Sequence, residues 1–99
     1  MDQPKDSQLR IEIDEPTARG VYTNLALITH SETEFVLDFL FLQPQAAAAK
    51  VLARLVSSPL HAKRLLWALK DNLEKYEARF GAIEPGEAPK AADIHKFYQ

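Results

Sequence analysis

The stretch that decides the fold is the start of a long helix, and it reads Ser57-Ser58-Pro59-Leu60-His61-Ala62-Lys63-Arg64-Leu65-Leu66. Ser58 is suited to cap a helix, and Pro59 fits the first helical position because its missing N–H would be unpaired there. Beyond this start, apolar residues recur every three or four positions and form one stripe: Ala62, Leu66, Leu69, Leu73, Tyr76 and Phe80. The sequence therefore predicts one long amphipathic helix that begins at Pro59 and is closed by Gly81 as a left-handed cap.

The same helix start carries cationic and titratable side chains where the helix macrodipole favours negative ones. His61, Lys63 and Arg64 follow Ser58 within the first two turns. Free first-turn N–H groups, a hydroxyl and nearby cations are what a phosphate or carboxylate site needs. We therefore take Ser58, His61, Lys63 and Arg64 as a candidate anion-binding site. The alternative is a solvated basic turn that pairs with the acidic residues Glu32, Glu34 or Asp38.

Upstream of this helix, the pattern has the period of two that is typical of strands. Residues 9–14 alternate apolar and charged side chains and predict an edge strand. Residues 15–20 predict a turn or loop, because Pro16 and Gly20 punctuate them. Residues 21–29 and 34–42 are rich in strand formers and are joined by a short polar link, which predicts an antiparallel hairpin. Residues 51–56 favour a fourth strand, and a helix over residues 45–56 is the competing interpretation. The predicted fold is α+β: an antiparallel meander of about four strands with one long C-terminal amphipathic helix packed on the sheet.

The strand over residues 34–42 is apolar on both faces, and Phe35, Leu37, Phe39 and Phe41 share one of them. Such a strand must be covered twice, whereas the rest of a 99-residue chain offers one obvious covering helix. Trp67 falls off the apolar stripe of that helix, so it is either exposed or part of a wide stripe on a curved sheet. These five residues are therefore interface candidates, and we expect a homodimer or a higher oligomer.

The ends of the chain differ in composition from its middle. Residues 1–8 are polar and predict a disordered N-terminus, residues 9–83 predict a single α+β domain, and Pro and Gly make residues 84–99 a flexible tail. Ile94, Phe97 and Tyr98 give this tail an apolar tip that could dock onto a groove. Neither a leader segment nor a membrane-length apolar run is evident. We therefore expect a cytoplasmic protein without membrane contact.

The charges are unevenly placed along the chain, whose net charge is −2. Residues 21–43 contain three acidic residues and no Lys or Arg, and residues 44–70 contain five Lys or Arg and no acidic residue. Two such segments either face each other, within a subunit or across a dimer, or present a basic patch to an external anion. Asp38, in an apolar strand, either pairs with a basic residue such as Arg54 or has a perturbed pKa and acts as a general base.

Several kinds of chemistry find no support in the residues. The chain has no cysteine, which excludes disulfides, thiol catalysis and thiolate zinc sites. Its three histidines stand in no metal-ligand spacing, and neither a Gly-rich phosphate loop nor a nucleophile elbow is present. Nucleic-acid binding is disfavoured by the slightly acidic isoelectric point of 5.9. We therefore expect a non-catalytic binding protein without metal or cofactor, whose partners are its own copies and another protein.

Two resemblances add to this interpretation. Tyr22-Thr23-Asn24, His30-Ser31, the run from Ser58 to Leu66 and Phe80-Gly81 resemble the pattern of a small bacterial and archaeal domain-of-unknown-function family. That resemblance covers the chain from Arg10 to Ile83 and implies a stand-alone domain with no established activity. The order of strands, Ser-Pro helix start and apolar-tipped tail also resembles a subunit of the SecB-type export chaperones. This second resemblance implies sheet-mediated pairing and binding of extended polypeptide in apolar grooves.

Overall fold

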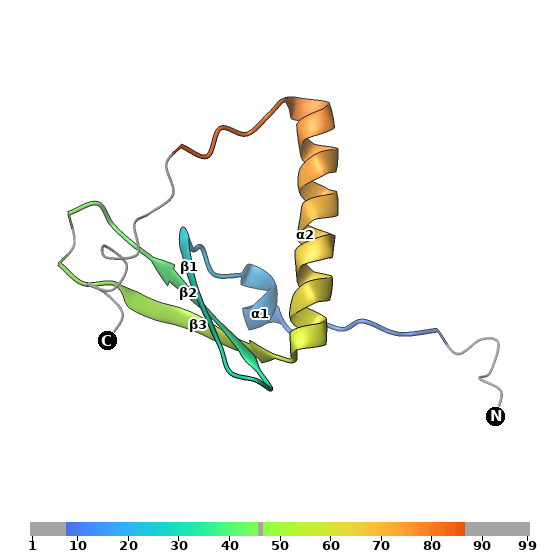
Figure 1. The fold of residues 1–99 in the computed structure, drawn as a ribbon, viewed down its shortest axis with the longest axis horizontal. Helices are drawn as coiled ribbons and strands as arrows, with labels where there is room; N and C mark the ends of the chain where they lie inside the picture. The colour runs from blue at the N-terminus through green and yellow to red at the C-terminus, as the bar shows by residue number, and fades with distance from the viewer. Residues whose placement is uncertain (1–7, 46, 87–99) are drawn as a thin grey trace.

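The computed structural model describes residues 8–45 and 47–86, which form a three-stranded antiparallel sheet and two helices (Figure 1). The elements, in chain order, are α1 (Glu15–Arg19), β1 (Leu25–His30), β2 (Phe35–Phe41), β3 (Lys50–Ser57) and α2 (Pro59–Phe80). The strands lie in the order β1-β2-β3, so the sheet is a meander with β2 at its centre. The predicted α+β class and the long C-terminal helix are confirmed, whereas the described residues form three strands and not four.

The hairpin of β1 and β2 is confirmed, and polar side chains secure both of its ends. In the turn, the Ser31 hydroxyl accepts a hydrogen bond from the Glu34 N–H (3.2 Å), and the Ser31 N–H donates to the Glu34 carbonyl (2.9 Å). At the open end, the Asn24 side chain donates to the Leu42 carbonyl (2.9 Å) and accepts from the Leu42 N–H (2.8 Å). Asn24 thus extends the ladder beyond the last paired residues and fixes its register.

Residues 50–57 form a strand, so the competing helix over residues 45–56 is wrong. β3 pairs antiparallel with β2, and its register places Arg54 opposite Asp38 and Leu55 opposite Leu37. The register shifts between Phe39 and Leu40, which indicates a bulge at that point. The strand forms because Val51, Leu55 and Val56 find a partner strand in β2, which outweighs the helix preference of the preceding alanines.

Residues 9–14 do not form the predicted edge strand within the described chain. These residues lie outside the sheet as an extended segment that leads into α1, and we call residues 9–13 the arm (Figure 1). The apolar side chains of the arm are exposed, and Ile11 retains 88% of its accessible surface. A period-two pattern favours the extended conformation, but a strand also needs a partner strand beside it. The arm pairs with no strand within the described chain.

Residues 15–19, which the sequence predicts as part of a loop, form the short helix α1. Its first turn is stabilised by Asp14, whose carboxylate accepts a hydrogen bond from the Thr17 N–H (3.0 Å), and by Pro16. Hydrogen bonds from the Thr17 side chain and backbone lower the pKa of the Asp14 carboxyl below its usual value. Pro16, which favours a loop when the sequence is considered alone, therefore lies in the first turn of a helix here.

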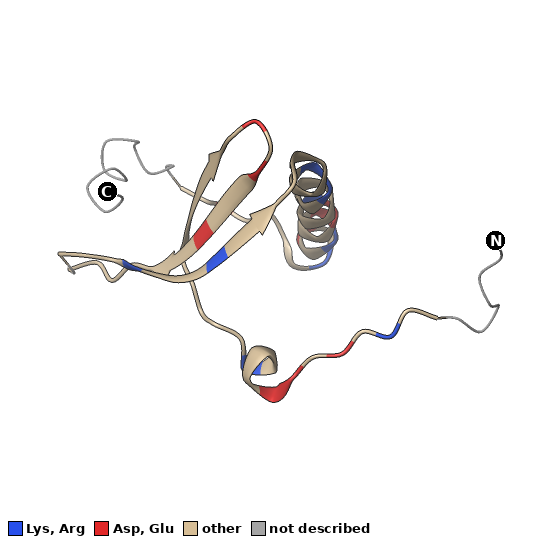
Figure 2. Cartoon of the chain, turned by 90° about the horizontal axis from the view of Figure 1, so that it is seen from below, with Lys and Arg blue, Asp and Glu red and all other residues tan. Residues whose placement is uncertain are grey.

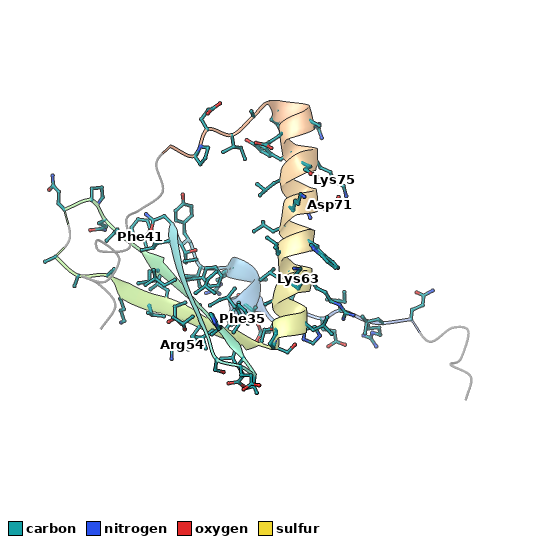
Figure 3. All side chains as sticks on the ribbon, viewed as in Figure 1. Phe35, Phe41, Arg54, Lys63, Asp71 and Lys75 are labelled. Atoms are coloured by element: carbon teal, nitrogen blue, oxygen red, sulfur yellow. The ribbon has the colours of Figure 1, made fainter. Side chains whose placement is uncertain are left out.

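The long helix α2 has the predicted ends. It begins at Pro59 and ends at Phe80, and the N–H of Gly81, whose φ is 101°, donates to the Glu77 carbonyl (2.9 Å). Gly81 has a ψ of 163°, so the chain leaves the helix extended rather than in the predicted left-handed turn. On the outer face, Asp71 and Lys75 are four residues apart and form an exposed ion pair with 3.0 Å between carboxylate and ammonium (Figure 3).

The core formed by the described residues is small and lies in the sheet. Leu27, Leu37 and Leu40 are its buried apolar residues, and no described residue of α2 is buried. The predicted packing of α2 on the sheet is therefore only partial. Because Ser58 alone separates β3 from α2, the helix starts at the sheet corner, and its later turns extend beyond the sheet (Figure 1).

The predictions for the two chain ends fall almost wholly outside the described residues. This applies to the disorder of residues 1–8, to the flexible tail over residues 84–99, and to the docking of Ile94, Phe97 and Tyr98. Within residues 8–45 and 47–86, no helix combines the length and the apolar character needed to cross a membrane.

Candidate functional site

The candidate site is an apolar groove of about 460 Å³ between the sheet and the first turns of α2, which we call the groove. Among the residues that the structure describes, its walls consist only of aliphatic and aromatic residues. They are Ala26 and Ile28 of β1, Phe35, Leu37 and Phe39 of β2, and Ala62, Leu65, Leu66 and Leu69 of α2. Without a charged or hydrogen-bonding side chain in its walls, the groove is suited to bind an apolar segment.

The groove results from the alternation of side chains along the strands and from their spacing of three and four residues along α2. Alternate residues of β2 point to the same side of the sheet, so Phe35, Leu37 and Phe39 share the face toward α2. The antiparallel register adds the β1 residues, because Ala26 lies opposite Phe39 and Ile28 opposite Leu37. On α2, the spacing of three and four residues brings Ala62, Leu65, Leu66 and Leu69 to one side. The groove is thus the place where the apolar stripe of the helix meets the apolar face of the sheet.

Three of the five predicted interface residues line the groove. Phe35 and Phe39 are half-buried there and Leu37 is buried. Phe41 lies at the other end of β2, in an edge-to-face arrangement with Tyr22 (Figure 3). Trp67 is exposed and lies outside the groove walls. The sequence prediction missed Ala26 and Ile28. Their place in the β1 alternation was a usable signal, but only the pairing register shows which face of β1 joins the groove.

The opposite face of the sheet holds an ion pair between Asp38 and Arg54. The Arg54 guanidinium donates to both carboxylate oxygens of Asp38, through Nε at 2.7 Å and Nη2 at 2.8 Å. Asp38 is completely buried, whereas 57% of the Arg54 side chain is exposed. The prediction that Asp38 pairs with Arg54 is confirmed, and the pair joins the acidic and basic segments of the chain within one subunit (Figure 2). A carboxylate held at both oxygens is poorly placed for a general base.

The predicted anion site at the start of α2 has only partly the geometry that a ligand would need. The Ser58 hydroxyl accepts from the His61 N–H (3.2 Å) and lies 3.1 Å from His61 Nδ1, so these two residues contact each other. Lys63 and Arg64 are exposed, and within residues 8–45 and 47–86 no ion pair joins them to Glu32 or Glu34. The cap therefore already occupies the hydroxyl that an anion would use.

Replacing Ser58 with alanine tests this structural role. We expect Ser58→Ala to lower the free energy of unfolding by about 1 kcal/mol, because the first turn of α2 loses its capping oxygen. The measurement is urea-induced unfolding followed by far-ultraviolet circular dichroism. Ser57→Ala is the matched control, since Ser57 ends β3 and does not cap α2. Equal effects of the two substitutions would contradict the capping role.

Metal ligands do not gather in the part of the chain that the structure describes. No group of three or more His, Asp or Glu side chains lies close enough there to hold a metal ion. His30 instead stacks its ring on Phe35, with 5.2 Å between ring centroids, next to the groove. Its ring thus adds to the aromatic surface at this end of the hairpin.

Comparison with known proteins gives one result that bears on this chain. The model of a family described as a protein of unknown function (DUF3467) matches residues 1–85. No curated protein and no solved structure matches the chain. The match includes the whole sheet and both helices, and with them all residues of the groove. The chain therefore belongs to the DUF3467 family of proteins of unknown function.

Proposed function

We propose that this protein is a non-catalytic binding protein that acts as a homo-oligomer and holds an apolar polypeptide segment of a partner in the groove. The observation that carries this proposal is the groove itself, whose walls are apolar on both the sheet side and the helix side. A polypeptide fits this site better than a small polar metabolite, because nothing in the walls would orient polar groups.

The exposed surface of the subunit supports an oligomer. The described residues leave large apolar side chains exposed outside the groove, among them Ile11 of the arm, with 88% of its surface accessible, and Phe80 of α2, with 64%. No residue of α2 is buried. Apolar surface of this kind is normally covered by a partner, and a second copy is one such partner.

The large apolar residues along α2 point to the same conclusion. Leu66, Leu69, Leu73, Tyr76 and Phe80 belong to the stripe that the sequence predicts as a buried face, yet each is exposed in the subunit. Contiguous apolar surface of this kind marks an interaction site in soluble proteins. The first turns of the stripe line the groove, and its later turns are available to a second copy.

The two other functions considered from the sequence have weaker support. An anion at the start of α2 would compete with the cap formed by Ser58, and Lys63 and Arg64 are exposed side chains on a chain of net charge −2. Nucleic-acid binding would rest on the same two cations. Binding of extended polypeptide, as in SecB-type chaperones, uses an apolar groove and is the broad-specificity form of the function proposed here.

The test uses a permanently unfolded probe, a reduced and carboxymethylated model protein with a fluorescent label. We expect saturable binding of this probe by the wild-type protein, measured by fluorescence anisotropy. Leu66→Glu should weaken that binding at least tenfold, because it introduces a charge into an apolar wall that has no partner for it. Because 56% of the Leu66 surface is exposed, the substitution leaves the subunit fold intact.

Leu60→Glu is the matched control for this experiment. Leu60 has nearly the same exposure, 57%, and lies about 120° from Leu66 around the helix, outside the groove walls. The control should bind the probe like the wild-type protein. Loss of binding in both variants, or in neither, would contradict a role of the groove. Suppression of aggregation of several unrelated unfolded proteins would favour the chaperone form over binding of a single partner.

A further inference from the structure

The arm has the sequence pattern of a strand but pairs with no strand within the described residues of its own chain. Its apolar residues Leu9, Ile11 and Ile13 alternate with Arg10 and Glu12, and all of them lie in an extended segment outside the described sheet. The three apolar side chains are among the most exposed of the described residues. A solvated segment gains nothing from such aliphatic side chains, so their exposure indicates a surface that is covered in the assembly.

β3 offers the kind of edge that such an arm would join. It pairs with β2 on one side and with no described strand on the other, so it forms a border of the sheet over eight residues. Apolar side chains on both faces of β3 are exposed, among them Leu52, Leu55 and Val56. Proteins normally shorten, cover or charge an edge of this length, because it pairs readily with another extended chain.

Length favours β3 over the other border strand, β1, because β3 has eight residues and β1 has six. A longer unpaired edge offers more backbone groups to an added strand. The lengths are also compatible, since five extended residues span about 17 Å and the eight residues of β3 about 26 Å.

The direction of the arm favours a second copy over the arm's own sheet. From α1 the arm runs away from the three strands and extends past α2, in both views of the chain (Figures 1 and 2). An arm that projects from its own subunit in this way can reach the border of a neighbouring subunit. Exchange of arms between two copies is a common route to a symmetric dimer.

We propose that the arm of one copy adds to the outer edge of β3 in a second copy and forms the fourth strand of that copy's sheet. On one face, Leu9, Ile11 and Ile13 then lie beside Leu55 and Ala53, which share the α2 side of the sheet with Leu37 and Phe39. The arm would thus widen the apolar floor next to the groove. This inference rests on the homo-oligomeric part of the proposed function and specifies how the copies associate.

Engineered disulfides test which edge receives the arm, and the chain is suited to them because it has no cysteine. The variant Ile11→Cys is mixed with Leu55→Cys or with Ala53→Cys, unfolded and refolded together, and then oxidised. Cross-strand neighbours come close enough for a disulfide with little movement. We expect mass spectrometry of the digested, unreduced protein to find the arm peptide linked to the β3 peptide. Because each chain contains one cysteine, such a link joins two copies.

The control mixture contains Ile11→Cys and Ile28→Cys, which places the second thiol on β1 at the other border. A link to position 28 in place of β3, or no link to β3, would overturn the proposal. The double variant Ile11→Cys/Leu55→Cys tests whether the arm joins the sheet of its own chain instead. If oxidation closes its disulfide within a single chain of 11.2 kDa, the arm joins its own sheet and the proposal is wrong.

A second measurement separates this inference from the proposed function. We expect light scattering to give at least twice 11.2 kDa for the wild-type protein and 11.2 kDa for Ile11→Asp. Val21→Asp, an exposed aliphatic residue outside the arm, should stay oligomeric. A monomeric wild-type protein would overturn both proposals. An oligomeric Ile11→Asp would overturn the arm exchange alone, since probe binding by the groove does not depend on it.

Discussion

Replacing Arg54 with alanine is expected to lower the free energy of unfolding by about 3–5 kcal/mol, because it removes the guanidinium that neutralises a completely buried carboxylate. Asp38 accepts both of the short Arg54 bonds and lies at the centre of the sheet, opposite Arg54 in the register. The loss should be seen in urea-induced unfolding at neutral pH. Arg54→Lys keeps the charge but loses the bidentate geometry. Its free energy of unfolding should therefore lie between those of the wild-type protein and Arg54→Ala.

Replacing the two partners of this pair is expected to lower the free energy of unfolding by unequal amounts. Asp38→Asn should cost less, about 1.5–3 kcal/mol, because the Arg54 side chain is 57% exposed and its charge can be solvated by water. The ranking follows from burial alone, since the interaction lost is the same. A double-mutant cycle with Asp38→Asn and Arg54→Ala measures the coupling. If Asp38→Asn costs as much as Arg54→Ala, the burial argument is wrong.

Leu40→Ala is expected to have the second-largest effect, a loss of about 2–5 kcal/mol in the free energy of unfolding. Leu40 is 1% exposed and lies on the central strand, with Leu25 of β1 opposite it on one side and Val51 of β3 on the other. The described subunit has only three buried apolar residues, so a cavity at one of them removes a large share of the core.

The matched control for Leu40 is Ile28→Ala on the neighbouring strand. Ile28 is 58% exposed in the subunit, so its truncation should cost well under 1 kcal/mol if the groove is empty. Both variants are compared by urea-induced unfolding at several protein concentrations. A similar loss for both would show that the groove is filled in solution by a second copy, which would place the core in the assembly rather than in the subunit.

Local signals in the sequence predicted the elements whose formation depends on near neighbours. The cap at Ser58, Pro59 in the first turn and the end at Gly81 were predicted correctly, because each acts over three or four residues. The hairpin of β1 and β2 was predicted for the same reason, since a short polar turn joins two apolar runs. α1 was missed, because its start signal, Asp14 followed by Pro16, is identical in composition to a turn.

The predictions from the sequence were incomplete where a structure depends on residues far apart in the chain. The alternation of residues 9–14 correctly indicates an extended chain, but strand pairing depends on an edge that the sequence does not place. The same holds for the groove. Phe35, Leu37 and Phe39 were identified as one apolar face, yet Ala26 and Ile28 join them only through the pairing register. The anion site was predicted from composition, but the Ser58 hydroxyl that an anion would use already accepts a hydrogen bond from the His61 N–H and caps α2.

The sequence by itself therefore determined the class of the fold, the start and end of α2 and the central hairpin, and it identified Arg54 as a candidate partner of Asp38. These features follow from short-range capping and from apolar and charge patterns that local chemistry enforces. Only the tertiary structure decided that α2 leaves its apolar stripe exposed, that the arm lies outside the described sheet, and which walls enclose the groove. The physical reason is that packing and strand pairing join residues far apart in the chain, and their geometry depends on all the elements together.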